Sequence, residues 1–320
     1  MPSGIYINTV TVKAENRKKS ENMSKLEKIW GLPVVSGRKN EISVRSPLLR
    51  KTSRIMLIGD YHSGLSDARE KPYEQYSRRM AQYSRADMVQ LQAMFRRAAE
   101  EKFDLIMLLG DILSFPSEAG VEYLAELIRC SPVPALFTAG NHDWHYEGIP
   151  GSDRAQREEW TAKRLAPLYS GRDPLYYSET VNDIEVAMID NSIYEILPEQ
   201  LSFMRRKLAE KKPVILGCHI PLYLPLSGHG RGVTNFGCGH PEWGGAADPY
   251  WQIERRERWH ENGLSRETFD FCKEVLGADN LLGIAAGHTH LFSLDFFRGK
   301  FQVVVSQFHE CVLELGPPER

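Results

Sequence analysis

Short apolar runs, most of them followed by a glycine, recur along the chain and predict buried strands. In the first of them, Ile55 to Ile58 are all apolar and Gly59 follows. Continuous runs of this length, as opposed to alternating ones, are typical of strands covered on both faces. The runs lie within residues 54–60, 103–111, 134–140, 184–190, 213–219 and 281–290.

Segments with helical spacing lie between these runs. Ser117 is a suitable N-cap for one of them, and Pro198 suits the first position of another. The expected helices cover residues 75–102, 117–129, 153–168, 198–210 and 265–276. Strands that alternate with helices in this way predict an α/β fold with a mostly parallel sheet.

Three further segments complete the expected organisation. Residues 41–45 alternate between polar and apolar side chains and predict an edge strand. Residues 292–297 and 301–307 flank a short polar turn and predict an antiparallel hairpin. Residues 221–263 are rich in glycine, proline and aromatic residues, and a connection of this length inside a compact domain is typical of a functional insertion.

The chain is expected to contain one domain preceded by a tail. We expect residues 1–53 to form an N-terminal tail and edge segment, partly disordered, with residues 1–22 mobile. Residues 54–320 would form the domain, with a substrate-side insertion at about 221–263.

Composition and charge argue against several classes of protein. The formal net charge of −2 argues against a dedicated binder of nucleic acid or of membrane surfaces. The chain has no apolar run long enough to span a membrane, and its N-terminus lacks the apolar core of a secretory signal. Five widely spaced cysteines without a CxxC pair predict reduced thiols, so we expect a cytoplasmic protein.

Potential metal ligands follow five of the predicted strands, and at each strand the first of them lies a residue or two after a glycine. Asp60 and His62 lie two residues apart, so in extended backbone their side chains would point the same way. Because the carboxyl ends of parallel strands meet at one edge of a sheet, all the candidates can share a cavity. They are Asp60, His62, Asp111, Asn141, His142, His219, His288 and His290.

This set of donors suits two divalent metal ions. Carboxylate, amide oxygen and imidazole are ligands for borderline ions such as Mn²⁺, Fe²⁺ or Zn²⁺. Two ions in a hydrolytic site lie about 3.5–4 Å apart, a spacing that favours a bridging carboxylate. A hydroxide between such ions is a nucleophile at neutral pH, which indicates attack on phosphorus.

The complete set also resembles a known family, the calcineurin-like metallophosphoesterase superfamily. Its motifs are matched in order and spacing by Gly59-Asp60-Tyr61-His62, Gly110-Asp111, Gly140-Asn141-His142-Asp143, His219 and Gly287-His288-Thr289-His290. The similarity covers about residues 54–310 and implies a four-layer α/β/β/α sandwich. One position departs from the pattern, because many members carry an acid where this chain has Ser114.

The resemblance implies a role for each residue. Asp111 would bridge two metal ions, whereas His142 would contact the phosphate or protonate the leaving oxygen, with Asp143 orienting it. An imidazole suits proton transfer because its ordinary pKa lies near neutrality. The first metal would be bound by Asp60, His62 and His290, and the second by Asn141, His219 and His288.

The implied activity is that of a hydrolase, a metal-dependent phosphoesterase acting on a small-molecule phosphate monoester or diester through a metal-bound hydroxide. Two alternatives stay open. A nuclease could use the same scaffold, although the chain lacks an extended basic stripe. A non-catalytic interaction module could reuse the fold, but such a protein would be expected to lose metal ligands. The sequence leaves the metals and the oligomeric state open.

Overall fold

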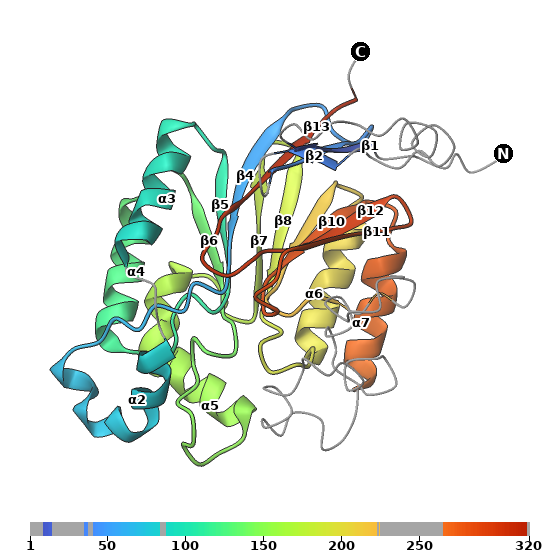
Figure 1. The fold of residues 1–320 in the computed structure, drawn as a ribbon. Coiled ribbons are helices and arrows are strands. Elements are labelled where there is room, and N and C mark those ends of the chain that lie inside the picture. Colours follow the sequence, from blue (N-terminus) through green and yellow to red (C-terminus); the bar gives the residue numbers. More distant parts are fainter. Residues whose placement is uncertain are drawn as a thin grey trace, which may run out of the picture.

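The computed structural model describes residues 9–14, 35–37, 41–83, 88–222, 224 and 265–318. Two β-sheets pack against each other, and helices cover the outer face of each sheet (Figure 1). This arrangement confirms the predicted four-layer α/β/β/α sandwich. The contact between the sheets is close at Gly217, where an added Cβ would lie 2.5 Å from the Met107 side chain.

The first sheet has seven strands in the order β2-β1-β3-β13-β4-β5-β6. The strands are β1 (Thr9–Ala14), β2 (Val35–Gly37), β3 (Glu41–Arg45), β4 (Ser53–Ile58), β5 (Leu105–Leu109), β6 (Ala135–Thr138) and β13 (Cys311–Gly316). Strands β4, β5 and β6 are parallel, whereas β13 runs antiparallel to β4. Their continuous apolar runs are buried on both faces, as predicted.

The second sheet has six strands in the order β11-β12-β10-β9-β8-β7. They are β7 (Tyr176–Val181), β8 (Ile184–Ile189), β9 (Val214–Gly217), β10 (Leu281–Ala286), β11 (Ser293–Phe297) and β12 (Lys300–Val304). Strands β8, β9 and β10 are parallel, and β11 and β12 form the predicted antiparallel hairpin. Both sheets are therefore mixed, with a parallel centre that sends several strands toward the same edge.

Helices α3 (Met88–Glu100) and α4 (Glu118–Cys130) cover the first sheet, and α6 (Pro198–Ala209) and α7 (Arg266–Gly277) cover the second (Figure 1). The remaining helices are η1 (Ala68–Tyr73), α2 (Glu74–Tyr83), α5 (Asp153–Trp160), η2 (Thr161–Leu165) and η3 (Ala166–Tyr169). Ser117 caps α4 by accepting a hydrogen bond from the Gly120 amide, as predicted. None of the helices among the described residues combines the length and apolar character needed to cross a bilayer.

Two predicted helices differ in the structure. The stretch 75–102 contains both α2 and α3, and residues 84–87 between them lie outside the described part of the chain. The stretch 153–168 is α-helical only through Trp160 and then continues as the π-helical η2 and the 3-10 helix η3. Pro167 explains the change, because it has no amide hydrogen with which to continue the α-helical pattern.

The N-terminal region also differs from its prediction. Residues 41–45 form a strand, but β3 is not at an edge, since it pairs with β1 on one side and with β13 on the other. Residues 9–14, which we expected in a mobile tail, form β1. Most of the expected insertion at 221–263 lies outside the described residues, and the division into 1–53 and 54–320 stays a prediction.

Candidate metal centre

The predicted ligands follow strands whose carboxyl ends lie at the same edge of the sandwich. Five of them have left-handed backbone conformations, with φ of 51° at Asp60, 51° at His62, 52° at Asp111, 75° at His288 and 61° at His290. Such conformations are costly for residues other than glycine and are concentrated at functional sites. The expectation that extended backbone aligns Asp60 with His62 is therefore wrong, because both residues lie in tight left-handed turns.

Hydrogen bonds between neighbouring turns hold these conformations in place. The amides of Asp60 and His62 donate to the carbonyls of Gly110 and Asp111, at 3.1 and 2.8 Å. The turn after β4 thus continues the pairing of β4 with β5 beyond the regular strands. Because this backbone is fixed, the directions in which its side chains leave it are fixed as well.

Glycines before the ligands allow the turns to approach one another. An added Cβ at Gly140 would lie 2.2 Å from a carboxylate oxygen of Asp111, and one at Gly110 would lie 2.5 Å from the Gly140 nitrogen. At Gly287 it would lie 2.9 Å from Asp60. Gly110, Gly140 and Gly287 therefore leave room for the ligands and backbone of neighbouring turns.

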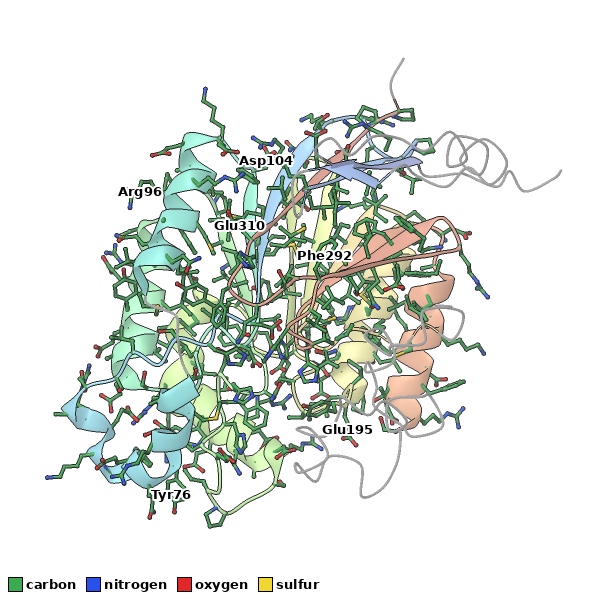
Figure 2. The ribbon with its side chains drawn as sticks, viewed as in Figure 1. Tyr76, Arg96, Asp104, Glu195, Phe292 and Glu310 are labelled. Carbon is green, nitrogen blue, oxygen red and sulfur yellow. The ribbon has the colours of Figure 1, made fainter. Side chains whose placement is uncertain are left out.

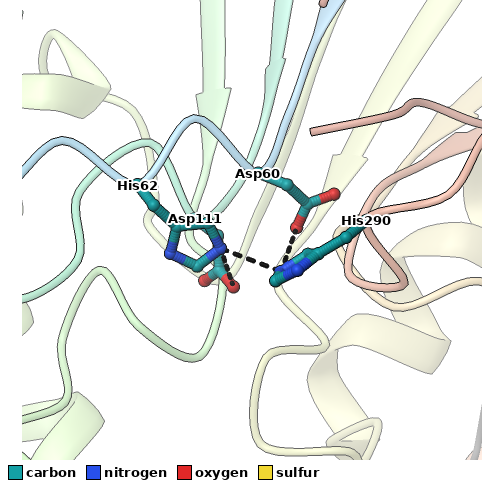
Figure 3. Close-up of side chains that lie close together, drawn as sticks. All are labelled: Asp60, His62, Asp111 and His290. Carbon is teal, nitrogen blue, oxygen red and sulfur yellow. Dashed lines mark hydrogen bonds and ion pairs between the residues drawn. The ribbon is translucent and has the colours of Figure 1, made fainter. Parts of the chain in front are cut away.

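Asp60, His62, Asp111 and His290 form a first group of possible metal ligands (Figure 3). The Nε2 atoms of His62 and His290 are 3.0 Å apart. Asp60 Oδ1 lies 3.7 Å from His290 Nε2, and Asp111 Oδ2 lies 3.7 Å from His62 Nε2. Four donor atoms from three different turns thus surround one point.

Asp111, His219 and His288 form a second group, and Asn141 lies beside it. His219 Nε2 is 3.2 Å from Asp111 Oδ2, 3.2 Å from Asn141 Oδ1 and 3.3 Å from His288 Nδ1. Asp111 belongs to both groups, and its Oδ2 atom faces a histidine of each. The structure therefore brings together the seven side chains that the sequence singled out as metal ligands, with the shared carboxylate between them.

The charges of these side chains fit a pair of cations. Asp60 Oδ2 is buried and makes no hydrogen bond to any described residue, an arrangement that costs free energy unless a cation compensates it. Burial, with the nearby Asp111 carboxylate adding to it, raises the pKa of Asp60 well above its usual range. Burial lowers the pKa values of His62 and His288, so their rings are neutral and can donate a lone pair.

His219 is held in one orientation. Its Nδ1 atom hydrogen-bonds the Leu109 carbonyl at 2.8 Å, which directs Nε2 toward Asp111. Burial lowers the pKa of His219, but the charge of Asp111, the hydrogen bonds to Asp111 and the Leu109 carbonyl, and the charge of Asp60 together raise the pKa to about 10. A metal ion and a proton would compete for the same Nε2 position, as is usual for imidazole ligands.

His142 lies beside the two groups and is half-buried. Its amide donates to Asp111 Oδ1 at 2.8 Å, and its ring centroid lies 5.0 Å from that of His62. The ring therefore stands at the rim of the first group, on a turn held by the shared carboxylate. The predicted contact of His142 with substrate stays a prediction.

Asp143 was predicted to orient His142, but its carboxylate contacts backbone amides instead. Its carboxylate accepts hydrogen bonds from the amides of Gly140, Asp111 and Leu113, at 2.7, 2.7 and 2.8 Å. The sequence could not distinguish this buried role from a catalytic one, because both place an acid beside His142. Burial, followed by the charge of Asp111, raises the pKa of Asp143 to about 7. Asp143 thus joins the turns after β5 and β6.

Two residues that the prediction did not use also support the site. Ser114, at the position where many relatives carry an acid, donates from Oγ to the His62 carbonyl at 2.9 Å and so holds the His62 turn. Asn191 accepts hydrogen bonds from the amides of His219 and Ile220. The sequence signalled Asn191 only as part of Asp190-Asn191-Ser192, which resembles the segment before the family's single-histidine motif, and assigned it no role.

Comparison with solved structures shows the same fold elsewhere. A dimetal phosphatase from Danio rerio superposes with a TM-score of 0.51 at 12% identity, over 81% of this chain and 88% of that one. A phosphopantetheinyl hydrolase from Mycobacterium tuberculosis has a TM-score of 0.40 at 13% identity, over 82% and 91% of the two chains. At 12% identity the likeness to the Danio rerio protein concerns the fold alone.

Sequence comparison assigns the family. No curated protein gives a significant match to the chain. The family profile described as calcineurin-like phosphoesterase matches residues 53–292, which include every predicted ligand. Because this match spans most of the chain, the protein belongs to the calcineurin-like phosphoesterase family.

Proposed function

We propose that the protein hydrolyses a phosphate monoester or diester with the help of two divalent metal ions. The observation that carries this proposal is the pair of ligand groups that share Asp111. A shared carboxylate can supply the bridging anion that favours two cations held as close together as in hydrolytic two-metal sites. The family match supports phosphoester chemistry, and the ligand chemistry is compatible with manganese, iron or zinc.

The proposed role of each ligand is set by the group to which it belongs. Asp60, His62 and His290 would hold the first ion, Asn141, His219 and His288 the second, and Asp111 both. When bound, two such ions supply positive charge that activates water and stabilises the phosphoryl oxygens. The protein contributes by fixing the donors before the ions arrive, since buried hydrogen bonds hold Asp60 and His219.

His142 would complete the reaction as a proton donor. Its half-buried ring stands beside His62, one of the residues that would hold the first ion. Protonation of the leaving oxygen by a positioned imidazole contributes typically about 10²–10⁴-fold to rate. Asp143 would act only indirectly, by joining the backbone before His142, at Gly140, to the turn that carries Asp111.

Metal analysis and substrate profiling test the proposal together. Protein purified without chelator should contain about two transition-metal ions per chain, by the two-metal requirement. Phosphate release from a panel of monoesters and diesters should disappear after chelation and return with Mn²⁺. Activity that survives exhaustive chelation contradicts the proposal. Metal without hydrolysis of any ester would instead favour an interaction module, and salt-dependent binding of DNA would favour a nuclease.

We also propose a cytoplasmic location. Four cysteines in the described part of the chain, Cys130, Cys218, Cys272 and Cys311, are free thiols, as a reducing compartment maintains them. Fractionation of cells that express the protein tests this location, and recovery from an oxidising compartment would contradict it.

A further inference from the structure

The segment Asp190–Ser192 supplies none of the candidate ligands, yet it hydrogen-bonds to the neighbours of two of them. It follows directly after β8, at the same edge of the sandwich as the metal centre. All three of its residues are buried. The side chains of Asn191 and Ser192 bind two different turns, the one that carries His219 and the one that carries Asn141 and His142.

Asn191 fixes the turn after β9. Its Oδ1 atom accepts hydrogen bonds from the amides of His219 and Ile220, at 3.1 and 3.0 Å. Its Nδ2 atom donates to the Ile220 carbonyl at 2.7 Å. One side chain thus satisfies three backbone groups beside a candidate ligand. Because an unsatisfied buried amide is costly, these bonds determine where the His219 backbone lies.

Ser192 fixes the turn after β6. Its Oγ atom accepts a hydrogen bond from Trp144 Nε1 at 2.8 Å and donates to Asp190 Oδ1. The other carboxylate oxygen of Asp190 lies 3.7 Å from Arg157 Nη1, and both of these side chains are buried. A chain of polar contacts therefore runs from a buried ion pair to Trp144, two residues after His142.

The two turns must be held together for the second group to exist. Asn141 Oδ1 and His219 Nε2 lie 3.2 Å apart, although they come from different sheets. Metal ligands require placement within a fraction of an ångström, and outer hydrogen bonds usually provide it. The Asp190–Ser192 segment is bonded to both turns and so sets their separation.

We infer that Asp190, Asn191 and Ser192 are positioning residues with two separable effects. Asn191 sets the affinity of the second group for its metal ion through His219. Ser192, held by Asp190, sets the position of the His142 ring through Trp144. This inference rests on the proposed function, because it assumes that the second group binds metal and that His142 protonates a leaving group.

Trp144→Phe tests the effect on His142. The substitution removes the indole donor and keeps an aromatic side chain. Trp160→Phe is a matched control, since Trp160 is equally buried but its Nε1 atom bonds to no described residue. We expect Trp144→Phe to reduce the rate on alkyl phosphate esters about 10-fold, below the 10²-fold that a misplacement of ~1 Å can cost. The rate on p-nitrophenyl esters should change little, because that leaving oxygen needs little protonation.

Asn191→Ala tests the effect on the second group. Asn280→Ala is its control, because Asn280 is also buried and bonds two backbone carbonyls, those of Leu208 and Lys212, far from the site. We expect the second Mn²⁺ ion to bind about 10–100-fold more weakly to the Asn191 variant, the usual cost of losing an outer partner. Titration of the metal-free protein with Mn²⁺ measures this without any assay of activity.

Equal behaviour within either matched pair overturns the inference. If Trp144→Phe and Trp160→Phe lose rate equally on both ester types, Trp144 has only a structural role. If Asn191→Ala and Asn280→Ala bind two ions alike, Asn191 does not set the affinity. Ser192→Ala and Asn191→Asp repeat the two tests in case a variant fails to fold. Failure of the proposed function is distinguishable, because the unsubstituted protein would then hydrolyse no ester.

Discussion

The two halves of the candidate centre place their ligands by different means. In the first group, Asp60, His62 and His290 all have left-handed backbones, so the main chain itself directs the side chains. In the second, only His288 is left-handed, whereas Asn141 and His219 have ordinary backbones and are held by side-chain hydrogen bonds. The His290 side chain is 42% exposed, whereas that of His219 is fully buried. A first site that opens to solvent thus lies beside a second site enclosed by protein.

This difference suggests that the two ions would exchange at different rates. An exposed ligand can leave and return without disturbing its neighbours, whereas a buried one can move only with the hydrogen bonds around it. Asp111 couples the halves, since it faces a histidine of each. Variants of Asp111 and of residues in each half can therefore test whether the two groups differ in how they hold their ions.

The largest effect is expected from Asp111→Asn. One side chain serves both groups, so both ions should be lost or weakened together, and activity with them. Asp104→Asn, whose side chain bonds the Arg54 amide at the opposite end of the strands (Figure 2), should keep metal and activity. Elemental analysis measures how many ions each of the two variants retains. An Asp111→Asn protein with two ions and full activity would show that the halves are independent.

His142→Ala should lose about 10²–10⁴-fold in rate, the scale of general acid catalysis, and should keep both ions. The loss should be large for alkyl esters and small for p-nitrophenyl esters. His309→Ala, at an exposed histidine, is the control. An equal loss on both ester types would mean that His142 binds phosphate instead of donating a proton. Loss of metal would place His142 among the ligands.

His290→Ala should weaken the first ion and spare the second, leaving about one ion per chain. The affected ligand is the exposed one, and the second group keeps its own set of donors. Brief chelation of the unsubstituted protein should give the same one-ion state. Stoichiometry measured during a timed chelation checks both expectations. Loss of the two ions at equal rates would refute the difference between an open and an enclosed half.

The smallest effect is expected far from both halves, at Glu185. Burial would raise its pKa, but hydrogen bonds from Lys207, Ser178 and Thr180 lower it to about 2. Because the pKa is lower in the folded state, the stabilisation is present above the unfolded value and is lost as pH falls from about 4.5 toward 2. Glu185→Gln should cost about 1–3 kcal/mol at neutral pH without loss of metal, measured by urea unfolding. An unchanged stability would contradict this.

The sequence identified the ligands because each follows an apolar run and a glycine, a pattern that local composition determines. It could not supply the left-handed turns at Asp60 and His62, which depend on hydrogen bonds to the turn after β5. It could not separate Asp143 from a catalytic acid, because three amides from distant residues make its carboxylate structural.

Among the strands that the structure describes, β1, β2, β7 and β13 were not predicted, and the last two were missed for a similar reason. Strand β7 pairs with β8 at the edge of the second sheet and has only partial burial, so its apolar signal is weak. Strand β13 inserts between β3 and β4, more than two hundred residues away in sequence. Pairing at that distance leaves no trace in a local pattern.

The position of β13 has a consequence for how the protein is made. Strand β4, which leads into Asp60 and His62, pairs with β5 on one side and with β13 on the other. A ribosome adds about 5–20 residues per second, so residues 311–316 emerge long after β4. Until then one edge of β4 is an open template for other strands. The order of synthesis thus leaves the strand that carries Asp60 and His62 toward the site with one unpaired edge until β13 has been made.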